Sequence, residues 1–112
     1  MQRSLDWNAM SQPTVENSLG FEIEALYDML DALYEVPVGT PTTGDWGLVF
    51  VDDHATPHIL EAFLTFVNKL VGKTTFEESD NQIWYVQTFI EGHIRTLSSV
   101  IDGIRTRESL AQ

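Results

Sequence analysis

Three segments of this chain carry apolar residues at the three- and four-residue spacing of an α-helix, and this pattern constrains the fold more than any other feature. At about 100° per residue, the apolar set of the first segment falls on one helix face. That set is Leu19, Ile23, Leu26, Leu30 and Leu33. The first helix should begin at about residue 14 or 18 and end at Glu35, because Pro37 disfavours a helical conformation at Val36.

The second helix should begin at Pro57, a residue suited to the first helical turn, with Thr56 as its N-cap. It should continue to about Val71, where Gly72 ends it. Its apolar residues cover nearly half of the circumference, which predicts the most buried helix of the domain. They are Ile59, Leu60, Phe63, Leu64, Phe66, Val67, Leu70 and Val71.

The third helix should follow the capping residues at 79–81 and run to about Arg105. A narrow apolar stripe repeats every seven residues, as in a coiled coil. It consists of Ile83, Ile90, Leu97 and Ile104. Together, this stripe and the broad apolar face of the second helix present more apolar surface than two neighbouring helices need to cover. This excess favours a homodimer.

The connection from residue 36 to residue 55 is long for a compact domain. Its apolar run Leu48–Val51 is rich in β-branched and aromatic residues, which favours a short strand. We therefore predict a mainly α fold, a three-helix bundle-like domain at 13–106, with a long ordered loop or a short β-hairpin between helices 1 and 2. Residues 1–12 are expected to form an N-terminal arm, and 107–112 a C-terminal tail.

The 112 residues are enough for one domain with a core of its own. The absence of cysteine excludes disulfides, thiol catalysis and cysteine-ligated metals. Neither a signal peptide nor an apolar window of about 20 residues is present, so we expect a cytoplasmic protein without a membrane partner.

Acidic residues are concentrated in the first half of the sequence. Eleven carboxylates and no lysine or arginine lie between Arg3 and Lys69. Residues 1–53 hold ten acids and one base, whereas residues 54–112 hold seven acids and five bases. This uneven distribution of charge argues against an acidic surface spread evenly as an adaptation to high salt. The excess of negative charge also repels nucleic acid, so direct binding of DNA or RNA is not expected.

Four of these carboxylates, Glu24, Asp28, Asp31 and Glu35, form one stripe on the first helix, opposite its apolar face. The stripe is either solvated surface or a docking site. As a docking site, it predicts a small acidic non-enzymatic interaction protein, an inhibitor or adaptor, that binds a basic protein surface. A protein surface that normally binds nucleic acid is one such target. No cofactor is expected.

Trp46 and Trp84 lie beside predicted loops and are candidate anchors for a partner, although core packing is the other common role of such residues.

The alternative function is an oligomeric small-ligand module or a metal-dependent hydrolase that uses Asp52, Asp53, His54 and His58. Two imidazoles and two carboxylates suit zinc, manganese or iron(II). Pro57 prevents His54 and His58 from sharing one continuous helix, and the glutamate of a zincin motif is missing. A polar turn that precedes the second helix explains the same residues without a metal.

Overall fold

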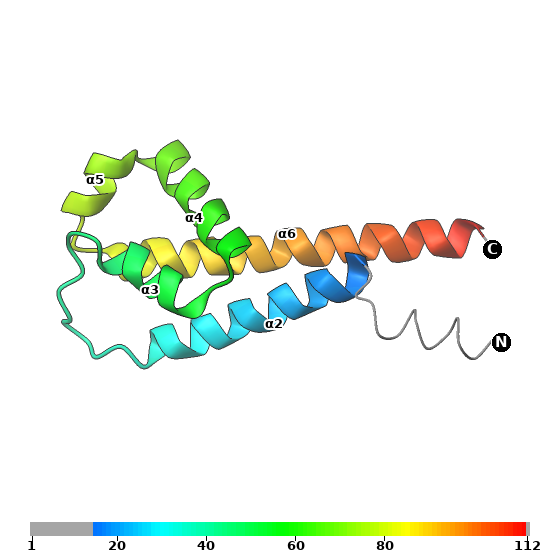
Figure 1. The fold of residues 1–112 in the computed structure, drawn as a ribbon, viewed down its shortest axis with the longest axis horizontal. Helices are drawn as coiled ribbons and strands as arrows, with labels where there is room; N and C mark the ends of the chain where they lie inside the picture. The colour runs from blue at the N-terminus through cyan, green and yellow to red at the C-terminus, as the bar shows by residue number, and fades with distance from the viewer. Residues whose placement is uncertain (1–14, 112) are drawn as a thin grey trace.

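The fold is mainly α, as the sequence predicts. The computed structural model describes residues 15–111, so the predicted arm at 1–12 lies outside the described residues. Within that range there are five helices and no strand. They are α2 (Val15–Tyr34), α3 (Trp46–His54), α4 (Pro57–Leu70), α5 (Lys73–Glu78) and α6 (Gln82–Ala111). Figure 1 shows α2 running alongside the much longer α6, with α3, α4 and α5 gathered at one end.

The pairing of α2 with α6 is the most extensive helix contact of the fold. From α2, Leu26, Met29 and Leu33 are buried. The middle of the heptad stripe of α6 is also covered within the same chain, since Ile90 and Leu97 are buried, whereas Ile83 and Ile104 at its ends are half-buried. The middle of this stripe therefore needs no second chain to cover it. The homodimer itself stays a prediction.

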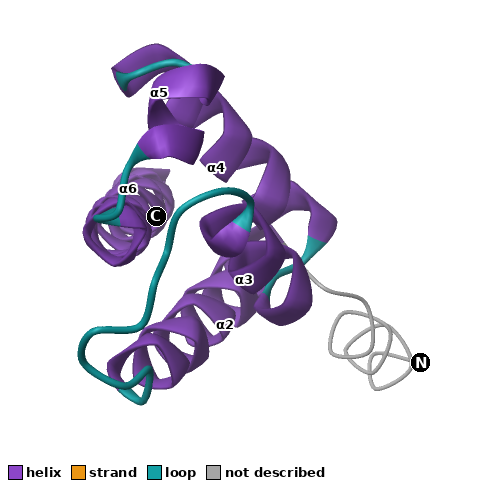
Figure 2. Ribbon diagram, turned by 90° about the vertical axis from the view of Figure 1, so that its left-hand side faces the viewer, coloured by secondary structure: helices purple, strands orange, loops and turns teal. Residues whose placement is uncertain are grey.

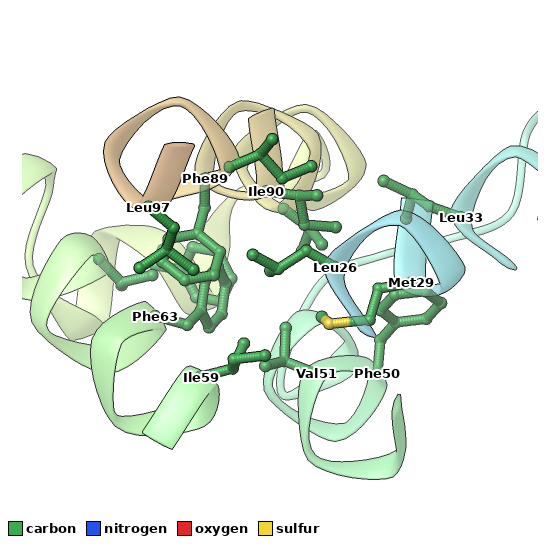
Figure 3. Packing of buried hydrophobic residues seen from close by; sticks show 14 residues of the cluster. Leu26, Met29, Leu33, Phe50, Val51, Ile59, Phe63, Phe89, Ile90 and Leu97 are labelled. Carbon is green, nitrogen blue, oxygen red and sulfur yellow. The ribbon is translucent and has the colours of Figure 1, made fainter. Parts of the chain in front are cut away.

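Helix α4 has the limits that the sequence predicts. The hydroxyl of Thr56 accepts a hydrogen bond from the backbone N–H of Ile59 at 3.4 Å, and Pro57 occupies the first turn. Gly72 follows the helix with a φ of +78°, a conformation that favours glycine. The buried side chains of α4 face α6 and α3. In Figure 3, Phe63 lies beside Phe89, and Ile59 lies beside Val51.

The strand predicted at Leu48–Val51 is wrong, because residues 46–54 form helix α3. A short continuous apolar run does not distinguish a buried strand from a buried helix, and tertiary packing overrides β-propensity. Here Gly47, Phe50 and Val51 recur at helical spacing and are buried. No hairpin is present in residues 36–55; a loop over residues 35–45 leads from α2 to α3 (Figure 2).

The three-helix bundle also requires correction. Residues 73–78, between the second and third predicted helices, form the short helix α5, and its Phe76 is fully buried. Helix α6 continues to Ala111, so the predicted tail at 107–112 is helical over its described residues. Both differences lengthen the helical part of the chain beyond the three segments with clear periodicity.

A buried glutamine joins the loop at 35–45 to the start of α6. The side-chain Oε1 of Gln82 accepts a hydrogen bond from the backbone N–H of Gly47 at 2.7 Å. Its Nε2 donates to the carbonyl oxygens of Gly44 and Phe76, each at 2.9 Å. The hydroxyl of Thr42 accepts from the backbone N–H of Gln82 at 3.1 Å and donates to the carbonyl oxygen of Asp80 at 2.8 Å. These bonds satisfy the buried polar groups where α3, α5 and α6 meet.

Candidate functional site

The four carboxylates of the predicted stripe all lie on the exposed face of α2. Glu24, Asp28, Asp31 and Glu35 are exposed, while Leu26, Met29 and Leu33 of the same segment are buried against the rest of the fold. Three of the four belong to α2, and Glu35 follows its last residue directly. The structure therefore brings these residues together on one solvent-facing surface, which we call the acidic face of α2.

The charges of this face have no cationic partner within residues 15–111. Two ion pairs occur in that range, Lys73 with Glu77 and Arg105 with Glu16. Neither includes a carboxylate of the acidic face. Like charges at i and i+4, such as Glu24 and Asp28, cost a few tenths of a kcal/mol in an isolated helix. No basic side chain of the described residues therefore pairs with the carboxylates of this face, which are open to solvent.

Exposed aromatic rings border the acidic face on both sides. Phe21, Tyr27 and Tyr34 are 65%, 52% and 63% exposed, respectively. The two tyrosines lie seven residues apart on one side of the carboxylates, and Phe21 lies on the other. Large exposed rings near one another are unusual on a solvated helix and are common at protein interfaces.

Of these aromatic residues, Tyr27 and Tyr34 are functional candidates that the sequence reasoning missed. The signal for them is a repeat of four residues with a period of seven, in which Ala25–Asp28 reads Ala-Leu-Tyr-Asp and Ala32–Glu35 reads Ala-Leu-Tyr-Glu. In each copy the leucine is buried, whereas the tyrosine and the acid are exposed.

The two candidate tryptophans lie on other helices. Trp46 begins α3, is half-buried and stacks on Phe50 with ring centroids 5.4 Å apart. Trp84 lies in the first turn of α6, is 49% exposed and packs edge-on against Tyr85 at 5.1 Å. Trp46 therefore has a packing role in the fold, and Trp84 keeps about half of its surface free for a partner.

The candidate metal ligands are not brought together. Asp52 lines a hollow between α3, α4 and α5, whereas Asp53 and His54 line a second one beside Trp46. His58 lines a third, between α2, α4 and α6. The Nδ1 atom of His54 donates a hydrogen bond to the carbonyl oxygen of Phe50 at 2.8 Å. Across the described part of the chain, no group of three or more histidine, aspartate or glutamate side chains is arranged to hold a metal ion.

The hollow that contains His58 has a volume of about 480 Å³. Glu22 of α2 and His93 of α6 also line it. His93 is half-buried and stacks on Phe89 at 5.2 Å. Burial lowers the pKa of His93, because the charged imidazolium loses hydration, and the nearby Glu22 carboxylate opposes this shift.

The lowered pKa of His93 predicts a loss of stability in mild acid. The unfolded chain binds the proton more readily than the folded chain, so stability is complete above the ordinary histidine value of about 6.5. It falls as the pH decreases from there through the folded-state pKa. Urea unfolding at about pH 7.5 and 5.5 should therefore show a smaller acid-induced loss for His93→Gln than for the wild type. Parallel losses in the two proteins would refute this assignment.

Comparison with known proteins gives no functional assignment, so a function must be inferred from the structure itself. No protein-family model matches the sequence, and neither a curated protein nor a solved structure gives a match. Among the helices of residues 15–111, none is both long enough and apolar enough to cross a bilayer.

Proposed function

We propose that the protein is a small non-enzymatic interaction protein, an inhibitor or adaptor, that docks the acidic face of α2 on a basic protein surface. A surface that binds nucleic acid through lysine and arginine side chains is one such target, because carboxylates then take the places of phosphates. The observation that carries the proposal is the exposure of all four carboxylates with no cationic partner in the described part of the chain.

The location of the charges supports this mechanism. The helix turns Leu26, Met29 and Leu33 into the core, so the carboxylates face outward without any change in the fold. Their common sign attracts a basic partner over several ångströms and accelerates encounter, an effect that added salt screens. Exposed charges contribute mainly to the association rate, whereas buried aromatic contacts slow dissociation. Trp84, with half of its surface free, is a candidate for such a contact.

Charge reversal tests the proposal. The partner is first captured from an extract at low ionic strength, released at high ionic strength and identified. Its affinity is then measured for the wild type and for the triple variant Glu24→Lys, Asp28→Lys, Asp31→Lys. We expect affinity to fall at least about tenfold, since exposed charge pairs contribute roughly 0.2–1 kcal/mol each and the introduced lysines repel the partner.

A matched control distinguishes the effect of charges located on α2 from the effect of net charge alone. The variant Asp52→Lys, Glu61→Lys, Glu78→Lys changes the net charge equally, at exposed residues of α3, α4 and α5. It should retain most of the binding, and circular dichroism should show both variants folded. If the triple variant on α2 binds as well as the wild type, or if the control loses as much affinity, the acidic face is not the docking site.

A further inference from the structure

On the outer side of α2, carboxylates and tyrosine rings alternate along the helix. Glu24, Tyr27, Asp31 and Tyr34 follow one another at steps of three, four and three residues. Side chains at these spacings are neighbours on a helix surface. All four are exposed, so each ring lies beside a carboxylate with its surface open to solvent. We call this row the carboxylate–tyrosine ladder.

The ladder is regular because Glu24 and Asp31 are seven residues apart, as are Tyr27 and Tyr34. Tyr27 and Tyr34 are separated by about 10.5 Å along the helix axis and by only about 20° around it. Asp31 lies between them, three or four residues from each. A partner that contacts both rings must therefore present two groups at the same separation, which is the distance between residues i and i+7 of another helix.

Arginine is the side chain that binds both the carboxylates and the tyrosine rings of the ladder. Its planar guanidinium donates two parallel hydrogen bonds to a carboxylate and stacks on an aromatic ring. The lysine ammonium pairs with the carboxylate as a point charge and matches the planar ring less well. A basic surface recognised by charge alone would need no rings, yet both tyrosines are kept exposed beside the acids.

We infer that the partner docks on α2 through a helix that carries arginines at i and i+7. This inference rests on the proposed function and names the basic group. A second copy of α2 does not fit, because its carboxylates would face those of the first. The arginines of the partner helix lie over the ladder, each between a carboxylate and a tyrosine ring.

Three synthetic helical peptides test the inference by fluorescence anisotropy at low ionic strength. The first carries arginines at i and i+7 on one face, the second carries lysines at the same positions, and the third has the composition of the first with its arginines distributed around the helix. The wild type should bind the first peptide about tenfold more tightly than either of the others, because two ring contacts and two bidentate pairs form together.

Substitutions on α2 supply the decisive comparison. Tyr27→Leu with Tyr34→Leu should abolish the preference for the first peptide, whereas Tyr27→Phe with Tyr34→Phe should retain it. Phe21→Leu, an exposed ring outside the ladder, should leave the preference unchanged. If the wild type binds all three peptides with equal affinity, and only the charge-reversal variant binds them more weakly, the ladder is refuted and the proposed function stands. If none of the peptides binds even at low ionic strength, the docking of α2 on basic groups is itself refuted.

Discussion

Replacing Gln82 with methionine is expected to lower the free energy of unfolding by about 3–5 kcal/mol. Methionine has a similar volume and shape, so the main change is the loss of three hydrogen bonds. The backbone N–H of Gly47 then stays buried without a partner. The carbonyl oxygens of Gly44 and Phe76 each lose one bond, and that of Phe76 keeps only the bond from the backbone N–H of Ser79. An unsatisfied buried group costs about 1–3 kcal/mol. Urea unfolding followed by circular dichroism measures the difference.

Gln87→Met on the same helix is the matched control, because Gln87 is only partly buried. It should change the free energy of unfolding by less than about 1 kcal/mol. The loop at 35–45 and the start of α3 should also lose protection from hydrogen exchange in Gln82→Met, since this side chain holds Gly44 in the loop and Gly47 in α3. Equal stabilities of the two methionine variants would show that the glutamine does not hold the loop.

The second large effect is expected for Phe63→Ala, which should cost about 3–5 kcal/mol of stability. Phe63 is fully buried in α4. Its ring meets those of Phe76 and Phe89 edge-on, with centroids 5.7 and 5.2 Å apart. Truncation removes these contacts between α4, α5 and α6 and leaves a cavity that close-packed neighbours fill only in part.

Leu64→Ala is the control for this prediction, because the next residue of α4 is 39% exposed. It should cost less than about 1 kcal/mol. Chemical denaturation of both variants under identical conditions compares them directly. A loss for Leu64→Ala as large as that for Phe63→Ala would mean that α4 presents a different face to the core.

The sequence predicts the long helices well, because their signals are local. Thr56 and Pro57 define the start of α4, and the apolar period of α2 identifies its buried face. Helix α3 is missed for a physical reason. Its apolar run has no polar face that would reveal a period, and its start depends on a hydrogen bond from Gly47 to Gln82, which is 35 residues away in sequence. Short helices such as α5 likewise depend on one buried residue, here Phe76.

The residues of the candidate site also differ in how well local sequence signals predict them. Helical spacing places Glu24, Asp28 and Asp31 on one face, and the structure shows them exposed there. The exposure of Tyr27 and Tyr34 is less evident, since tyrosines beside an apolar stripe are found both inside and outside a core. Their positions become clear only once α6 is seen to cover Leu26 and Leu33 instead.

The most direct test of docking through the acidic face of α2 is the association rate constant with the captured partner, measured by stopped flow over a range of salt concentrations. For the wild type, the rate should fall steeply as salt rises, since the attraction acts through solvent. The variant Glu24→Lys, Asp28→Lys, Asp31→Lys should associate slowly and with little dependence on salt. Wild-type and variant rates that share the same salt dependence would contradict the account.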